Sequence, residues 1–350
     1  MGADAGSFVE AVTATVFTRD VTAATSPREV THASGRRRSV EDMDPVSDLT
    51  RFVQRRLGTA LRNRVAGDDA PQHAERIWGA EGERWFTPDD PIWRVHADAS
   101  MFPGGIASLL LQSLHPLAMA GVAGHSGYRG DPWGRLQRTS HYLAITTYGT
   151  VEHAHEVIGH VRGIHERVRG KDEKGRPYSA ADPHLLRWVH LAEIDSFLRA
   201  HQTFGSDPLS PRDTDRYVEQ AGVPAALLGV VDPPRSVAEL RRALEEYRPE
   251  LEPSEAARDA ARFLLLDPPL PFVARPGYAT LATGGLSLLP PWALEMLEIP
   301  LPRPVSRLVA RPVGRFGTAA VRWGMAGLGE RRPSDQDVTD PTPDATAAAS

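Results

Sequence analysis

The chain has 350 residues, of which 41% are hydrophobic, and this is enough apolar side chain to fill the core of one large domain. Its formal net charge of -5 excludes the basic surface that nucleic-acid binding requires, so nucleic acid is not an expected partner. The absence of cysteine excludes disulfides, Fe–S clusters, thiolate-bound haem and cysteine-based zinc sites, and any metal must be held by His, Tyr or a carboxylate.

The two ends of the chain differ in composition from its middle. Residues 1–43 are rich in Ala, Thr, Ser and Arg without a helical period, and residues 329–350 form a low-complexity stretch of Pro, Asp, Thr and Ala. We predict that both segments are disordered and that residues 44–328 form one domain. No export signal is visible near the start, so a cytoplasmic protein is expected.

The middle of the chain shows apolar residues at helical spacing and few alternating, strand-like runs, which predicts an all-α, multi-helix domain. The predicted helices cover residues 46–64, 105–122, 132–148, 150–169, 182–204, 211–221, 236–247, 253–265 and 305–327. Proline-rich segments at 267–271 and 288–291 predict that the C-terminal third is a covering layer of helices and extended linkers.

Residues 99–128 contain no Asp, Glu, Lys or Arg and are long enough to cross a membrane. Pro103, Gln112 and Pro116 interrupt the apolar run, however, and such breaks are more typical of a helix buried inside a large domain. We therefore expect no transmembrane segment here.

The helix predicted at 132–148 begins with Asp131-Pro132, a helix cap followed by a first-turn proline. Steps of three and four residues place Arg135, Arg138, Thr139 and Tyr142 on one face, where two guanidinium groups and two hydroxyls could bind an anion. The alternative is an exterior face with ordinary ion pairs.

The helix predicted at 150–169 places a histidine within its apolar stripe. The members of this stripe are Val151, Ala154, Ile158, Val161, His165 and Val168. His153 and His160 fall on the opposite, charged face and receive no role. Arg162 and Arg169 flank His165 by one turn on either side, and an anion such as the carboxylates of a porphyrin would satisfy buried guanidinium groups. A hydrogen-bonded core histidine with surface arginines is the alternative.

The helix predicted at 182–204 begins with Asp182-Pro183 and carries His190 one turn before Glu193. A histidine and a carboxylate at this spacing can share a metal ion. They can equally form an ordinary hydrogen-bonded pair, or orient the ligands of a metal bound elsewhere.

A set of short motifs occurs in a specific order along the chain. The motifs are Leu111-Gln112 with His115-Pro116, His125-Ser126, Asp131-Pro132, Arg135 with Arg138-Thr139, Tyr148-Gly149, Arg162 with His165, Tyr178 with Ala180 and Asp182-Pro183, and Trp188-Val189-His190. Together, across about residues 93–301, they resemble the MpaB-like and rubber-oxygenase (latex-clearing protein) family. The resemblance implies an all-helical domain that buries a b-type haem between its helices.

The same resemblance implies roles for individual residues. His165 matches the proximal haem ligand, with Arg162, Arg169 and Arg135 as cofactor-binding residues. Arg135, Arg138 and Thr139 match the distal catalytic element, in which the rubber-cleaving branch has lysine instead of Arg138. That branch also has a distal glutamate, whereas no acidic residue lies between Asp98 and Asp131, which argues against rubber cleavage.

We therefore expect a haem b oxygenase that combines dioxygen with a small apolar organic substrate, such as an alkene or an isoprenoid-like molecule. Two other classes remain open. One is a non-haem metal enzyme centred on His190 and Glu193, and the other is a helical protein that binds haem without catalysis or has a structural role only.

Overall fold

The computed structural model describes residues 50, 52–60, 74–125 and 129–327, and most of them are helical. The elements that precede residue 205 are η2 (Glu75–Gly79), α4 (Pro91–Ala97), α5 (Met101–Gln112), α6 (Pro116–His125), α7 (Pro132–Tyr148), α8 (Val151–His165), β2 (Arg169–Lys171), β3 (Pro177–Ser179) and α9 (Pro183–Phe204). The later elements are α10 (Pro211–Leu228), α11 (Val237–Tyr247), η3 (Arg248–Glu250), α12 (Glu255–Leu265), η4 (Phe272–Ala274), α13 (Arg275–Leu288), α14 (Pro291–Met296), α15 (Arg303–Val305), η5 (Ser306–Ala310) and α16 (Arg311–Ala326). The predicted all-α single domain is confirmed.

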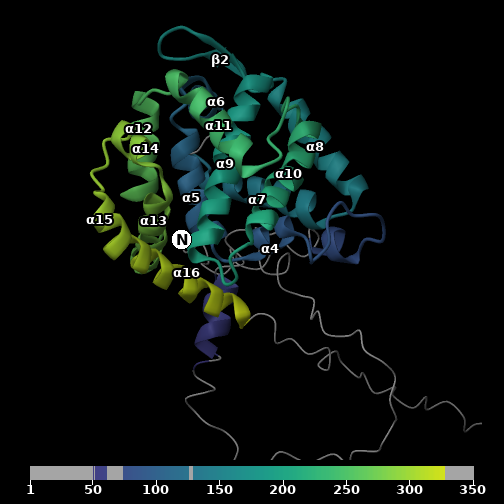
Figure 1. Ribbon diagram of the computed structural model, residues 1–350, viewed down its shortest axis with the longest axis vertical. Helices are drawn as coiled ribbons and strands as arrows, with labels where there is room; N and C mark the ends of the chain where they lie inside the picture. Colours follow the sequence, from purple (N-terminus) through teal and green to yellow (C-terminus); the bar gives the residue numbers. More distant parts are fainter. Residues whose placement is uncertain (1–49, 51, 61–73, 126–128, 328–350) are drawn as a thin grey trace, which may run out of the picture.

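The centre of the domain is the pair formed by α5 and α9, which pack along each other (Figure 1). A Cβ added to Gly104 of α5 would lie 3.0 Å from the Cβ of Ala200 on α9, so the absence of a side chain lets the two helices approach closely. In Figure 1, α12–α15 lie on the left of this pair, α16 runs beneath it, and α7, α8 and α10 lie on its right. The main apolar core includes Leu110, Leu191 and Tyr217, which are fully buried.

The predicted ends of several helices agree with the structure. α7, α9 and α11 begin and end within one residue of the predicted bounds. Each begins after a side chain that caps it, because Asp131, Asp182 and Ser236 each accept a hydrogen bond from a backbone N–H in the first turn. Such caps act over only a few residues, and this is why they can be read from the sequence.

The single helix predicted at 105–122 is wrong. The structure has two helices here, α5 and α6, which are bent by 108° relative to each other. Pro116 is the first residue of α6, where its missing N–H costs nothing, and residues 113–115 form the corner between the helices. No single described helix is long and apolar enough to cross a membrane, although the bent pair α5 and α6 meets the criteria of length and composition.

The helix predicted at 150–169 ends early. α8 stops at His165, and Arg169 lies in β2, which pairs antiparallel with β3 so that Gly170 is opposite Tyr178. A Cβ on Gly170 would lie 2.6 Å from the Tyr178 hydroxyl oxygen, so a larger residue here would force the Tyr178 ring to move. Residues 172–176 are therefore the turn of a hairpin.

Two predictions for the C-terminal half also change. α10 continues to Leu228, beyond the predicted end at 221, because Gly222 and Pro224 are accommodated inside the helix and buried. α13 was not predicted as a helix, yet it packs against both α5 and α16 and belongs to the core instead of a covering layer. The predicted disordered segments 1–43 and 329–350 lie outside the described residues, and of the helix predicted at 46–64 only residues 50 and 52–60 are described, as helix.

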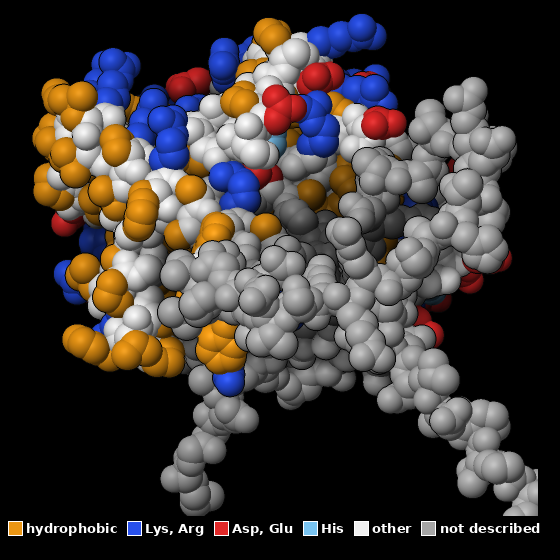
Figure 2. All heavy atoms as spheres, turned by 90° about the horizontal axis from the view of Figure 1, so that it is seen from below, with side chains coloured by type: hydrophobic (Ala, Val, Ile, Leu, Met, Phe, Trp, Pro, Cys, Tyr) orange, Lys and Arg blue, Asp and Glu red, His pale blue; other side chains and the backbone are white. Residues whose placement is uncertain are grey.

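The side of the molecule formed by α12–α16 carries exposed hydrophobic side chains (Figure 2). Phe272, Val273, Leu308 and Phe316 are among the most exposed of them. These four residues belong to η4, η5 and α16, whose outer faces are thus apolar, whereas α13 contributes to the core.

Candidate functional site

His165 is the last residue of α8, which packs against α7 and α10. The helix begins at Thr150, whose hydroxyl accepts a hydrogen bond from the backbone N–H of His153 at 3.3 Å. The imidazole of His165 is half-buried, and its Nδ1 is buried without a hydrogen-bond partner. Burial lowers the pKa of His165, so the ring is neutral at pH 7. A neutral imidazole with an unsatisfied nitrogen is the form in which histidine binds a metal ion.

The two arginines that flank His165 in the sequence are both exposed. Arg162 lies on the outer side of α8, and Arg169 lies in β2, where its Nε donates a hydrogen bond to the carbonyl of Glu166 at 2.9 Å. We expected both guanidinium groups to be buried beside the apolar face of α8, and neither is. Arg162 faces outward from α8, and Arg169 lies beyond the end of the helix at His165. Arg162 and Arg169 remain predicted cofactor-binding residues that would act only from the rim of a site.

The predicted anion-binding face of α7 is divided between interior and surface. Arg138 and Thr139 are exposed; Arg138 forms an ion pair with Asp131 at 3.2 Å, and the Thr139 hydroxyl donates to the carbonyl of Arg135 at 3.0 Å. Arg135 and Tyr142 are half-buried. Burial, followed by the neighbouring charge of Arg138, lowers the pKa of Arg135. Arg135 thus faces partly into the domain, as an anion-binding residue would. Arg138 and Thr139 lie on the exterior, as in the alternative of a face with ordinary ion pairs.

Arg135 borders a small apolar cavity. The cavity has a volume of about 110 Å³. Its lining residues are Leu109, Gln112, Ser113, Ala118, Met119, Val122, Pro132, Arg135, Val189, Phe263 and Leu264. Ligand cavities for drug-sized molecules occupy roughly 300–1,000 Å³, so this space fits a small molecule or one end of a longer apolar chain.

His190 and Glu193 lie inside the domain on α9. Burial, with the nearby charge of Arg187, lowers the pKa of His190 to about 4, and its Nε2 has no hydrogen-bond partner. Burial raises the pKa of Glu193 to about 7. No third His, Asp or Glu from the described ranges approaches this pair closely enough to share a metal ion. The predicted non-haem centre on His190 and Glu193 therefore lacks a third protein ligand among these residues.

Glu193 belongs to a group of half-buried and buried polar side chains whose association the sequence did not reveal. Its charge raises the pKa of Tyr142 on α7 and of Tyr217 on α10, in addition to the larger effect of burial on both. The Tyr217 hydroxyl lies 3.5 Å from Nε2 of His96, whose Nδ1 is 2.8 Å from the Thr147 hydroxyl. The space between α7, α9 and α10 is thus polar, although it is enclosed by apolar helices.

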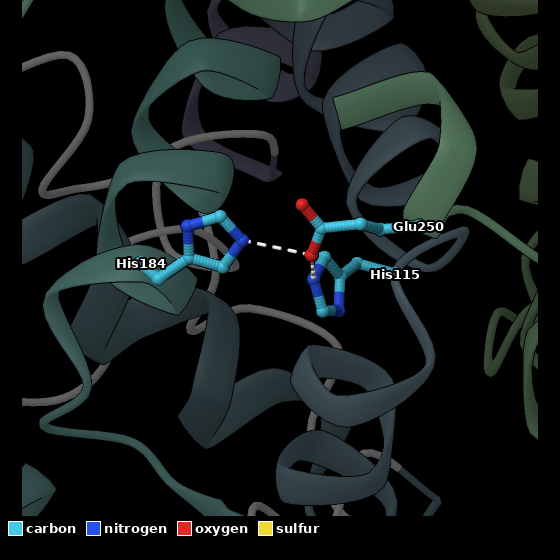
Figure 3. Close-up of side chains that lie close together, drawn as sticks. All are labelled: His115, His184 and Glu250. Atoms are coloured by element: carbon cyan, nitrogen blue, oxygen red, sulfur yellow. Dashed lines mark hydrogen bonds and ion pairs between the residues drawn. The ribbon is translucent and has the colours of Figure 1, made fainter. Parts of the chain in front are cut away.

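A second cluster was also missed, and it lies on another face of α9. His115, in the corner between α5 and α6, meets His184 of α9 and Glu250 of η3 (Figure 3). The three ligand atoms lie within 4.8 Å of one another. The sequence singled out His115 only as part of the His115-Pro116 motif, and nothing local indicates that His184 and Glu250 join it.

Comparison with protein families assigns residues 93–323, well over half of the chain, to the family described as "ER-bound oxygenase mpaB/B'/Rubber oxygenase, catalytic domain". The chain belongs to this family. The region matched to the MpaB and rubber oxygenase family begins in α4 and ends in α16, so it includes His165, Arg135, both residues of the His190–Glu193 pair and the cluster of Figure 3.

Two relatives within the curated proteins are similar to part of the chain. They are uncharacterized proteins of Mycobacterium bovis and Mycobacterium tuberculosis, each 30% identical over 162 residues, which is 45% of this chain and 63% of the relative. The match therefore spans less than two thirds of the length of each relative. No solved structure matches the chain.

Proposed function

We propose that this protein is a haem b-dependent oxygenase that uses dioxygen to oxidise a small apolar organic molecule, with His165 as the axial iron ligand. The observation that carries the proposal is the neutral imidazole of His165, whose buried Nδ1 lacks a partner, within the catalytic domain of an oxygenase family. The chain contains no cysteine, so histidine is the natural axial ligand for iron in a porphyrin.

The residues present fit a haem in two further respects. A b-type haem carries two carboxylates, and the half-buried guanidinium of Arg135 offers a charge and a planar set of donors for one of them. The polar interior of Tyr142, His190 and Glu193 supplies groups that can form hydrogen bonds beside a cofactor. These features support haem more than a non-haem metal on His190 and Glu193.

When bound, the haem iron would supply the activation of dioxygen. His165 would hold the iron, and the apolar wall of the cavity beside Arg135 would bind the substrate and exclude water. A carboxyl with a pKa of about 7 can hold or release a proton near neutral pH, so the Glu193 carboxyl would serve as a proton reservoir. Arg135 would offset negative charge at the mouth of the site.

The visible spectrum and the iron content of the purified protein test the proposal. Wild type should show a Soret band with one haem per chain. His165→Ala should fold and lose most of this haem, because a small cavity usually costs no more than about 5 kcal/mol. His160→Ala is the matched control, since His160 is an exposed histidine on the same helix, and it should retain the haem.

Full, unaltered haem binding by His165→Ala would remove His165 as the ligand. If wild type contains iron or manganese but shows no Soret band, and if His190→Gln loses this metal, the result would instead favour the non-haem alternative. If wild type contains neither porphyrin nor a redox metal after reconstitution with haem, the proposed function as a whole is contradicted.

A further inference from the structure

The cluster in Figure 3 joins three parts of the chain that are distant in sequence. His115 occupies the corner between α5 and α6, His184 lies in the first turn of α9, and Glu250 ends η3. The Oε2 atom of Glu250 is 2.8 Å from Nε2 of His184 and 3.6 Å from Nε2 of His115. Both imidazoles therefore point at a single carboxylate oxygen.

We propose that His115, His184 and Glu250 form a zinc site, distinct from the haem site proposed above. Two imidazole nitrogens and one carboxylate oxygen are a ligand set typical of zinc. In a tetrahedral site with bonds of 2.0–2.2 Å the ligand atoms are roughly 3.3 Å apart. The present separations, all within 4.8 Å, reach that geometry through small side-chain movements.

His115 gives the strongest indication of a bound cation. Its side chain is 3% exposed, Nδ1 has no hydrogen-bond partner, and Nε2 lies 3.6 Å from the carboxylate of Glu250, which is too long for a hydrogen bond. A buried polar group without a partner costs about 1–3 kcal/mol, and a native fold rarely tolerates this without a function.

The hydrogen bonds of His184 leave its Nε2 available as a ligand atom. The Tyr247 hydroxyl donates its proton to the carbonyl of His184 at 2.9 Å, so its oxygen accepts a hydrogen bond from Nδ1 of the same residue at 3.2 Å. With the proton on Nδ1, the lone pair of Nε2 faces the carboxylate of Glu250. Two lone pairs at 2.8 Å repel each other unless a cation lies between them.

A proton or a metal ion could be that cation. A proton on Nε2 of His184 would satisfy His184 and Glu250, but it would leave Nε2 of His115 at 3.6 Å from the same oxygen, too far for a good hydrogen bond. A metal ion binds all three groups at once. The metal therefore accounts for more of the observed geometry than an ion pair between His184 and Glu250 does.

The three ligands are held in position by contacts outside the cluster. The backbone N–H of Glu252 donates to the carbonyl of Leu114 at 2.9 Å, which ties the segment after η3 to the corner that carries His115. Trp188 Nε1 donates to the carbonyl of Gln112 at 3.1 Å and ties α9 to the same corner. His184 and Glu250 are about half exposed, so solvent can supply a fourth ligand and zinc can enter.

Zinc titration of the full chain, freed of any affinity tag and treated with a chelator, tests the site. We expect one zinc per chain by calorimetry and a rise in the thermal unfolding midpoint, because a ligand that binds only the folded state stabilises it. His184→Gln and Glu250→Gln are the main variants, since both side chains are half-exposed and their loss should not prevent folding. Each should weaken zinc binding by more than about 100-fold, which exceeds the typical effect of losing an outer partner.

Matched controls separate the site from adventitious binding. His160→Gln and Glu219→Gln make the same changes at exposed positions and should bind zinc as wild type does. Tyr247→Phe removes the partner of Nδ1 and should weaken zinc binding by about 10- to 100-fold. Absence of zinc binding by wild type, or equal affinity of the His184 and control variants, would overturn the proposal. The Soret band should be unchanged in His184→Gln, so failure of this site and failure of the haem proposal are distinguishable.

Discussion

Burial sets the protonation state of the ionisable side chains inside this domain. It lowers the pKa of His96 to about 3 and that of His190 to about 4, with smaller effects of nearby His201 and Arg187, so both rings stay neutral over most of the accessible pH range. The same cause raises the pKa of Glu193 to about 7. The interior thus contains neutral imidazoles beside one carboxyl that titrates near neutral pH.

Glu193 should make stability depend on pH. The folded protein keeps a proton on Glu193 that the unfolded chain releases above its ordinary pKa of 4.5, so this contribution is fully present below pH 4.5 and is lost as the pH rises through about 7. We predict that Glu193→Gln increases the free energy of unfolding by about 1–3 kcal/mol at pH 8 and by little at pH 4.5. Urea denaturation at both pH values measures this.

His190, whose pKa is lowered, makes the free energy of unfolding change with pH in the opposite direction. Because wild type and Glu193→Gln both contain His190, this effect cancels when the two proteins are compared. Glu219→Gln, an exposed change of the same kind, should have little effect at either pH. A gain in Glu193→Gln of the same size at pH 4.5 and pH 8 would show that the carboxyl is not held neutral by the fold.

The division of α7 into an interior and a surface side gives a prediction for two arginines. Arg135 borders the apolar cavity, whereas Arg138 is paired with Asp131 at the surface. On the proposed function, Arg135→Ala should retain less than about half of the haem, since it removes a cation that can bind a haem carboxylate. Arg138→Ala should retain all of it, and haem per chain after reconstitution and desalting measures both. Equal retention in the two variants would place Arg135 outside the site.

At the scale of elements, close helix contacts depend on the absence of side chains. α13 crosses α16 where Gly284 faces Gly314, and a Cβ on Gly314 would collide with the Cα of Gly284 and lie 3.0 Å from Phe204. The collision involves backbone, which cannot move aside as a flexible side chain can. This contact lets α16 pack closely against α13, which itself packs against α5.

We predict that Gly314→Ala lowers the free energy of unfolding by about 1–3 kcal/mol, as overpacking of a core does. Gly277 of α13 is the matched control, because a Cβ there meets no atom within 4 Å. Gly277→Ala should be neutral or stabilising by up to about 1 kcal/mol, since alanine favours helix. Chemical denaturation of both variants measures this, and tolerance of Gly314→Ala would mean that the two helices can move apart at little cost.

At the scale of the whole molecule, Asp98 connects segments from the two ends of the described domain. Its buried carboxylate accepts hydrogen bonds from the backbone N–H of Ser100 at 2.8 Å, the hydroxyl of Ser206 at 3.1 Å and the guanidinium of Arg322 at 2.8 Å. Burial alone would raise the pKa of Asp98, but the hydrogen bonds from Arg322 and Ser100 lower it overall. The carboxylate therefore stabilises the fold while it is ionised.

We predict that Asp98→Asn lowers the free energy of unfolding by about 2–4 kcal/mol at pH 7, because it leaves the charge of Arg322 without its partner. Asp89→Asn is an exposed control and should change stability by less than about 0.5 kcal/mol. Denaturation followed by circular dichroism and by tryptophan fluorescence measures both. A variant as stable as wild type would show that Asp98 does not hold these segments together.

Features of the fold that depend on a few neighbouring residues were predictable from the sequence. The caps Asp131 and Asp182, with the prolines that follow them, located the starts of α7 and α9 to within one residue. The apolar period of α8 correctly placed Ala154 and Ile158 in the core, and it identified His165 as an inward position. These signals are local, since a cap and a helical period act within one or two turns of helix.

Other features were decided only by the tertiary structure. The sequence placed Arg135 and Arg138 on one face, but which part of that face is covered depends on the helices that pack against it. The same holds for Arg162 and Arg169, where α8 ends and a hairpin begins instead.

The cluster of His115, His184 and Glu250 is the clearest such case, because it forms where α5 bends into α6 and where η3 and the start of α9 meet that corner. The amino-acid sequence by itself determined where α7, α9 and α11 begin and end and which side of α8 carries its apolar residues and His165. Contacts between segments far apart in the chain determined which polar groups meet, because they depend on how whole helices pack together and not on the residues beside each group.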